Sequence, residues 1–93
     1  MQRLGFRHCT NAVGTAFLVA LGDETLELTL ESADELPAWD PQTEAFRLQV
    51  CGPPEPILPQ ATYRLQLAGD AYDIFIVPIA RDGAGTHYEA IFN

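Results

Sequence analysis

Hydrophobic and polar residues alternate with a period of two along most of the chain. In TLELTLES (25–32), Leu26, Leu28 and Leu30 share one face, while threonine and glutamate side chains share the other. Successive side chains of a β-strand point to opposite faces, so this period predicts a strand with one buried face and one solvated, acidic face. We predict six strands, near residues 15–21, 25–32, 44–51, 61–68, 71–80 and 86–93.

The connections between these strands favour an antiparallel arrangement. Gly22-Asp23-Glu24, Gly69-Asp70 and the glycine-rich segment 81–86 are short and typical of hairpin turns. Two longer connections, 33–43 and 52–60, hold six of the seven prolines and are predicted to be rigid loops. We therefore expect a single domain over 1–93 that is all-β: a small antiparallel six-stranded barrel or folded sandwich with mostly meander connections. Residues 1–12 are expected to form an N-terminal arm or a helical turn.

The segment DIFIVPIA (73–80) is apolar on both faces and contains Pro78. Proline lacks a backbone N–H, so it is largely confined to edge strands and bulges, and Pro78 predicts one or the other. One face is expected to join the core and the other to contact another part of this chain or another chain. Trp39, in a proline-flanked loop, either caps a barrel end or anchors an interface. The candidate interaction residues are Trp39, Tyr72, Ile74, Phe75, Ile76, Val77 and Pro78.

The charge of the chain limits its partners. A formal net charge of -8 comes from 13 acids and 5 basic residues, and all the basic residues are scattered arginines. Such a surface is a poor match for nucleic acid or for an anionic membrane. No segment is long and apolar enough for a membrane span. The apolar segment 12–22 behind Arg3 and Arg7 has the outline of a secretory signal, but Gly14 and Thr15 interrupt it. We expect a cytoplasmic protein.

Few residues suggest chemistry. Cys9 and Cys51 form no C-x-x-C motif, and two free thiols are favoured over a disulfide. His8 precedes Cys9, but neighbours in an extended chain point to opposite faces, and Cys51 is expected to be a small buried residue. A zinc site on His8 and His87 would lack two ligands, and the acids are expected to form a solvated face. The prediction is a non-enzymatic protein without a catalytic, metal-binding or cofactor-binding residue.

Four segments resemble a small bacterial family of unknown function. They are FRLQVCGP (46–53), LPQATYRL (58–65), IFIVPI (74–79) and HYEAIFN (87–93), and VGTAF (13–17) resembles the entry to the family's first strand. Ala61 departs from the glycine expected after Gln60, and the turn before residue 71 lacks an expected histidine. The resemblance implies a small protein without a known active site, sometimes encoded beside phage-tail-collar-like genes.

Two functional hypotheses follow from these patterns. The first is a β-domain that acts through protein–protein contact, as a homo-oligomer or as an accessory to a larger, phage-tail-like assembly. The second is a small-molecule-binding barrel or minor enzyme that uses the barrel mouth near Trp39 and Tyr72. The second requires an open interior, whereas the inward aromatic residues are expected to fill it: Phe17, Phe46, Tyr63 and Phe92.

Overall fold

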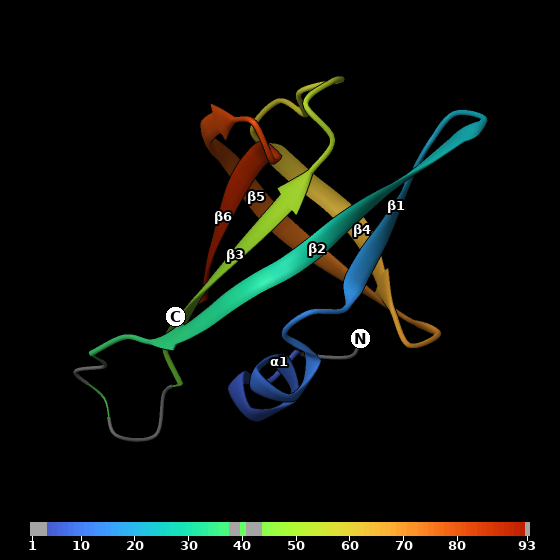
Figure 1. The fold of residues 1–93 in the computed structure, drawn as a ribbon. Helices are drawn as coiled ribbons and strands as arrows, with labels where there is room; N and C mark the ends of the chain where they lie inside the picture. Colours follow the sequence, from blue (N-terminus) through green and yellow to red (C-terminus); the bar gives the residue numbers. More distant parts are fainter. Residues whose placement is uncertain (1–3, 38–39, 41–43, 93) are drawn as a thin grey trace.

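The chain folds into a closed barrel of six antiparallel strands with one short helix, which confirms the predicted fold class (Figure 1). The computed structural model describes residues 4–37, 40 and 44–92. Trp39 lies outside the described residues. The elements in chain order are α1 (Phe6–Ala12), β1 (Ala16–Leu21), β2 (Glu24–Glu35), β3 (Phe46–Gly52), β4 (Ala61–Leu67), β5 (Asp70–Asp82) and β6 (Gly85–Phe92).

Four of the strand pairings join consecutive strands, as a meander does. The order around the barrel is β1-β2-β3-β6-β5-β4, so two pairings join strands distant in sequence. β3 pairs with β6 continuously from Phe46–Phe92 to Gly52–Thr86. β1 meets β4 through only Leu18–Gln66 and Val19–Leu65. The long connection after β3 therefore crosses one end of the barrel and leads to β4, which closes the barrel by pairing with β1.

The alternating residues fill the barrel interior. In β3, every second residue from Phe46 to Gly52 is buried, and the residues between them are half-buried on the outer face. Phe17, Leu28 and Leu30 are completely buried in the same core. Burial of a large apolar side chain contributes about 1.5–3 kcal/mol, so this continuous cluster is the main stabilising element of the barrel.

Each end of the barrel is closed by a different segment. At one end, α1 buries Cys9, and its Phe6 ring lies 5.7 Å from the ring of Phe46. At the other end, Leu58 of the proline-rich loop is 2% exposed, and its backbone N–H donates to the Tyr88 hydroxyl at 2.9 Å. Both closures shield the core from water.

β5 explains the proline in the apolar segment. Its first part, up to Ile76, pairs with β4, and from Val77 onward it pairs with β6. The edge-strand alternative is therefore wrong for the strand as a whole, because β5 pairs with β4 on one side and then with β6 on the other. The bulge alternative is confirmed, since the register shifts between Pro78 and Ala80. Pro78 sits beyond the β4 ladder, where β5 has a partner on one side only, so its missing N–H is tolerated.

One face of β5 joins the core, as predicted, and the other face points outward. Tyr72, Ile74 and Ile76 are buried and belong to the core. Phe75 and Ile79 point outward and are 49% and 46% exposed. No other described part of this chain covers these two side chains.

Candidate functional site

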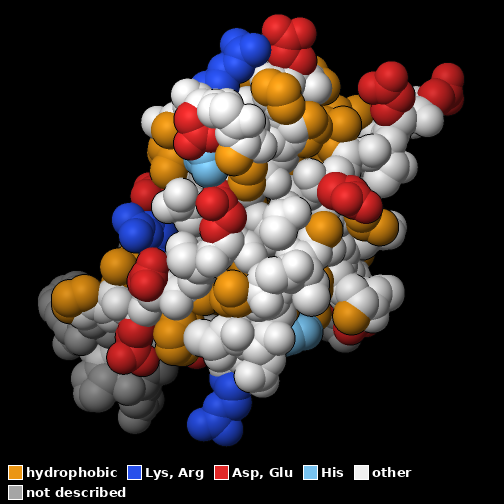
Figure 2. Space-filling view, viewed as in Figure 1, with side chains coloured by type: hydrophobic (Ala, Val, Ile, Leu, Met, Phe, Trp, Pro, Cys, Tyr) orange, Lys and Arg blue, Asp and Glu red, His pale blue; other side chains and the backbone are white. Residues whose placement is uncertain are grey.

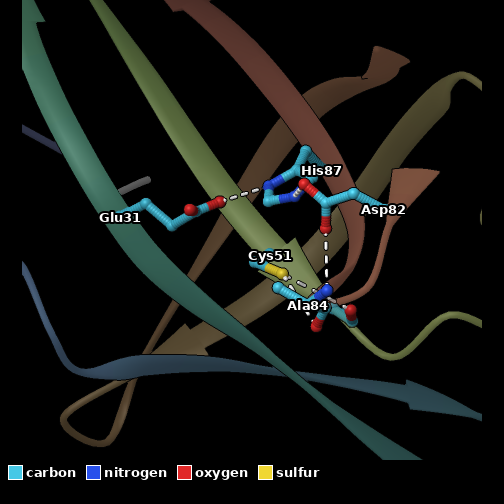
Figure 3. Close-up of polar contacts among 6 residues, drawn as sticks. Glu31, Cys51, Asp82, Ala84 and His87 are labelled. Carbon is cyan, nitrogen blue, oxygen red and sulfur yellow. Dashed lines mark hydrogen bonds and ion pairs between the residues drawn. The ribbon is translucent and has the colours of Figure 1, made fainter. Parts of the chain in front are cut away.

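Four polar side chains from four strands meet on the outer face of the barrel, near the end that the proline-rich loop closes (Figure 3). Cys51 of β3 and His87 of β6 are directly paired across the two strands. Glu31 reaches them from β2, and Asp82 from the end of β5. We call Glu31, Cys51, Asp82 and His87 the His87 cluster.

The imidazole of His87 lies between two carboxylates. Its Nδ1 is 2.6 Å from Oε1 of Glu31, and its Nε2 is 2.9 Å from Oδ2 of Asp82. His87 occupies an outward-facing position of its strand, yet it is only 7% exposed. A neutral imidazole donates from only one of its nitrogens, so contact of both nitrogens with carboxylates favours a bound proton or another cation.

The electrostatics of the His87 cluster follow from this geometry. Hydrogen bonds to Asp82 and then to Glu31 raise the pKa of His87 above its ordinary value of 6.5. The hydrogen bond to His87 and the one from the Ala84 N–H lower the pKa of Asp82 below 3.8. The ring of His87 therefore favours its protonated, positively charged form beside the Asp82 carboxylate.

Cys51 lies beside this charged pair as a thiol. Its Sγ is 3.6 Å from the carbonyl oxygen of Ala84 and 3.7 Å from that of Gly52. Burial raises its pKa above 9.0, and the negative charges of Glu31 and Asp82 raise it further. Because the thiolate is the nucleophilic form, these surroundings oppose a role for Cys51 as an activated nucleophile.

Two strand irregularities flank the His87 cluster. One is the register shift between Leu30 and Ser32, which leaves Glu31 as the extra residue of β2. The other is the shift between Pro78 and Ala80, next to the Ala80–His87 pair. Bulges redirect side chains and are frequent beside functional sites. Here they bring an acid toward the histidine from either side.

The turn after β5 also approaches Cys51 closely. Gly85 has φ +137°, a backbone conformation that favours glycine. A Cβ at this position would overlap the carbonyl oxygen of Gly52 and lie 3.3 Å from Cys51 Sγ. Glycine at position 85 thus lets the turn fold over the thiol.

The histidines and cysteines considered from sequence lie at two ends of the barrel: His8 and Cys9 in α1, and Cys51 and His87 on β3 and β6. His8 lies at the helix-capped end, with its ring 6.3 Å from that of Tyr72, so His8 and His87 occupy opposite ends of the barrel. Cys9 and Cys51 are free, as favoured, and burial raises the pKa of Cys9 to about 11. Cys51 is half-buried on the outer face, so the expectation of a small buried residue is wrong.

The match to a family of related sequences covers nearly the whole barrel. The family described as Domain of unknown function (DUF6916) matches residues 4–92. The chain belongs to the DUF6916 family. No match was found among curated proteins or among solved structures.

A second feature of this DUF6916 domain is an apolar strip on the outer face of β5. It consists of Phe75, Val77 and Ile79 of β5 and Ile91 of β6. Val77 is half-buried, and Ile91 is 48% exposed. Ile91 lies two residues beyond Glu89, the strand partner of Val77. We call these four residues the outer strip. Its aligned apolar side chains differ from isolated exposed residues, which need no explanation.

This DUF6916 domain also has hollows. One of about 470 Å³ follows the β1–β4 seam, lined by residues such as Val19, Tyr63 and Arg64. Another of about 440 Å³ lies beside α1 and includes His8 and Asn11. Tyr72 lines neither hollow, and the side chain of Tyr72 is 6% exposed. Among the described residues, no helix is long and apolar enough to cross a membrane.

Proposed function

We propose that this protein acts through protein–protein contact and that a second copy of the chain docks on the outer strip. The observation that carries the proposal is the exposure of Phe75 and Ile79 on one strand, at 49% and 46%. Stable interfaces place apolar and aromatic side chains at their centre and polar groups at their rim. Of the residues considered from sequence, Phe75 and Val77 are the ones on the outer strip.

Ion pairs border the outer strip. Arg64 and Asp73 lie 3.3 Å apart at one end, and Arg81 and Glu55 lie 3.3 Å apart beyond the other end. On the β6 side, Arg47 pairs with Glu89 at 3.6 Å and with Asp34 at 3.3 Å. The border thus offers both signs of charge around an apolar centre.

The distribution of charge favours a second copy as the occupant. The border holds three of the five arginines and four of the 13 acids, a formal charge of -1. The rest of the chain holds two arginines and nine acids, a formal charge of -7. Figure 2 shows acidic side chains at the tip of the β1–β2 hairpin, for example. Two copies repel each other through most faces, but the near-neutral outer strip avoids that repulsion.

A two-fold interface also needs a self-complementary surface, because the same patch contributes from both copies. The outer strip meets this condition, since each bordering arginine has an acid beside it that an arginine of the second copy can contact. A standard interface buries about 800 Å² on each partner. The chain exposes 5859 Å², so such an interface would use roughly one seventh of its surface.

Sedimentation velocity over micromolar to near-millimolar concentrations tests this proposal. The expected result is a monomer–dimer equilibrium that strengthens with added salt, because salt screens the repulsion between the acidic faces. Phe75→Asp should give a monomer, since it places a charge at the apolar centre. Leu18→Asp is the matched control: Leu18 is 38% exposed on β1, which is a neighbour of neither β5 nor β6.

Circular dichroism establishes that both variants are folded. A wild-type protein that stays monomeric throughout the concentration range contradicts the proposal, and so does equal dissociation by the two substitutions. A larger complex recovered only with other proteins would instead favour the phage-tail-like assembly that the family resemblance suggested.

A further inference from the structure

We propose that Glu31, Cys51 and His87 bind a divalent transition-metal ion of the zinc type, with Asp82 as the residue that orients the imidazole ring. One carboxylate oxygen, the Sγ atom and a ring nitrogen of these three residues lie within 4.8 Å of one another. The three ligands come from β2, β3 and β6, which are consecutive neighbours in the barrel. The site is independent of the outer strip and of the proposed self-association.

The positions of the ligands are fixed by the sheet. Cys51 and His87 are a cross-strand pair, so their side chains leave adjacent strands on the same face. Glu31 is the extra residue of the β2 bulge, and its side chain is 35% exposed. The two ligands on β3 and β6 are therefore held by regular pairing, while the third has freedom to adjust.

The distance between Glu31 and His87 requires only a small adjustment to accept an ion, while Cys51 Sγ, within 4.8 Å of the other two ligand atoms, has to lie about 3.5 Å from each of them. Nitrogen and oxygen ligands about 2.0–2.2 Å from zinc, at tetrahedral angles, lie roughly 3.4 Å apart. His87 Nδ1 and Glu31 Oε1 are 2.6 Å apart, which is the length of a strong hydrogen bond. Entry of the ion would replace the proton between these atoms and move the partly exposed Glu31 carboxylate outward by about 1 Å. Cys51 would lose its proton and become a thiolate ligand.

The types of ligand select the class of metal. Thiolate and imidazole favour zinc and related transition metals, whereas magnesium and calcium prefer oxygen atoms alone. Three protein ligands leave a fourth tetrahedral position for solvent or an exogenous ligand. The other cysteine, Cys9, is not available to the site, because it is completely buried within α1 at the opposite end of the barrel.

Asp82 supplies the contact that usually accompanies a metal-bound histidine. Such histidines donate their second ring N–H to a carboxylate or carbonyl group, which fixes the tautomer and the ring orientation. The Asp82 carboxylate lies 2.9 Å from Nε2 of His87, so Nδ1 is left for the metal. The backbone N–H of Ala84 donates to the other Asp82 oxygen at 2.8 Å and fixes that carboxylate in turn.

Cobalt(II) titration of chelator-treated protein tests this site directly. The expected result is one equivalent of bound cobalt with intense visible bands typical of tetrahedral coordination and a thiolate-to-cobalt charge-transfer band in the near ultraviolet. Zinc should displace the cobalt and remove both signals. Competition with a chromophoric chelator then gives the zinc affinity.

Cysteine and aspartate variants separate metal ligation from a structural role. Cys51→Ser should abolish the charge-transfer band, whereas the matched variant Cys9→Ser should keep it. Asp82→Asn should weaken zinc binding roughly 10–100-fold while the charge-transfer band remains at saturating cobalt. Circular dichroism confirms that each variant is folded, and Cys51→Ala provides a second removal of the thiol if Cys51→Ser is unstable. The proposal is overturned if the wild-type protein shows no cobalt spectrum, or if the band survives the loss of Cys51.

Discussion

The hydroxyl oxygen of Tyr88 accepts a hydrogen bond from the backbone N–H of Leu58, at 2.9 Å and inside the barrel end. The two residues are 30 positions apart, so this bond attaches the proline-rich loop to β6. Tyr88 is 1% exposed and Leu58 is 2% exposed, which leaves little room for water to replace either partner. The bond therefore fixes the loop that covers the core at this end.

Tyr88→Phe should lower the free energy of unfolding by about 1–3 kcal/mol, because the buried N–H of Leu58 loses its acceptor. Urea denaturation followed by circular dichroism measures the change. Tyr63→Phe is the matched control, since the Tyr63 hydroxyl donates to the carbonyl oxygen of Pro59 at 2.7 Å in an exposed place. Water can replace that bond, so a change within about 0.5 kcal/mol is expected. Equal losses in the two variants would show that burial does not decide the effect.

Gly85→Ala should destabilise the protein by at least about 1–3 kcal/mol from backbone strain, because φ is +137° there. The overlap of the new Cβ with the Gly52 carbonyl adds to this cost. Gly83→Ala is the control in the same turn, where a Cβ would meet nothing within 4 Å. Thermal unfolding should separate the two variants clearly, and a Gly85→Ala protein as stable as Gly83→Ala would contradict the close approach of the turn to β3.

The stability of the chelator-treated protein should fall as the pH rises from about 6 to 8.5. The pKa of His87 is raised above 6.5, so the folded state keeps its proton when the unfolded state has lost it. This stabilisation is complete below pH 6.5 and is lost as the pH rises through the folded-state pKa. Asp82 adds stability that is present above pH 3.8 and is lost as the pH falls through its lowered pKa.

Urea midpoints measured across this pH range check the prediction, with His87→Gln as the variant in which the decline should flatten. The groups that face the ring are Glu31 from β2, Cys51 from β3 and Asp82 from β5. The ordinary pKa of a thiol is 9.0 and that of Cys51 is raised, so titration of this thiol falls above the measured range. A wild-type decline that persists unchanged in His87→Gln would assign it to another group.

Sequence periodicity was sufficient to predict the strands and the core. Leu28 and Leu30 in the core, with acids on the other face, follow directly from a period of two. The short helix also lies within the segment expected to hold a helical turn. These features depend on neighbouring residues, which is why local patterns reveal them.

The His87 cluster could not be predicted in the same way. Cys51 and His87 become neighbours only through the pairing of β3 with β6, which joins strands far apart in the chain. Glu31 reads as one more residue of an acidic strand face until the bulge after Leu30 turns it toward His87. Pro78 indicated the bulge of β5, but the bulge of β2 has no such signal, since neither glycine nor proline stands at position 31. The pairing of β3 with β6 and the bulge at Glu31 are set by packing of the whole barrel, so they require the structure.

The narrow seam between β1 and β4 has a consequence for motion. Only two residue pairs, Leu18–Gln66 and Val19–Leu65, close the cylinder there, while β3 and β6 are paired along their full length. Separating two pairs leaves all four hairpins and the β3–β6 ladder in place, so it costs far less than global unfolding. Amide protons at this seam should therefore exchange with solvent through a local unrolling of the sheet, well before those of β3 and β6.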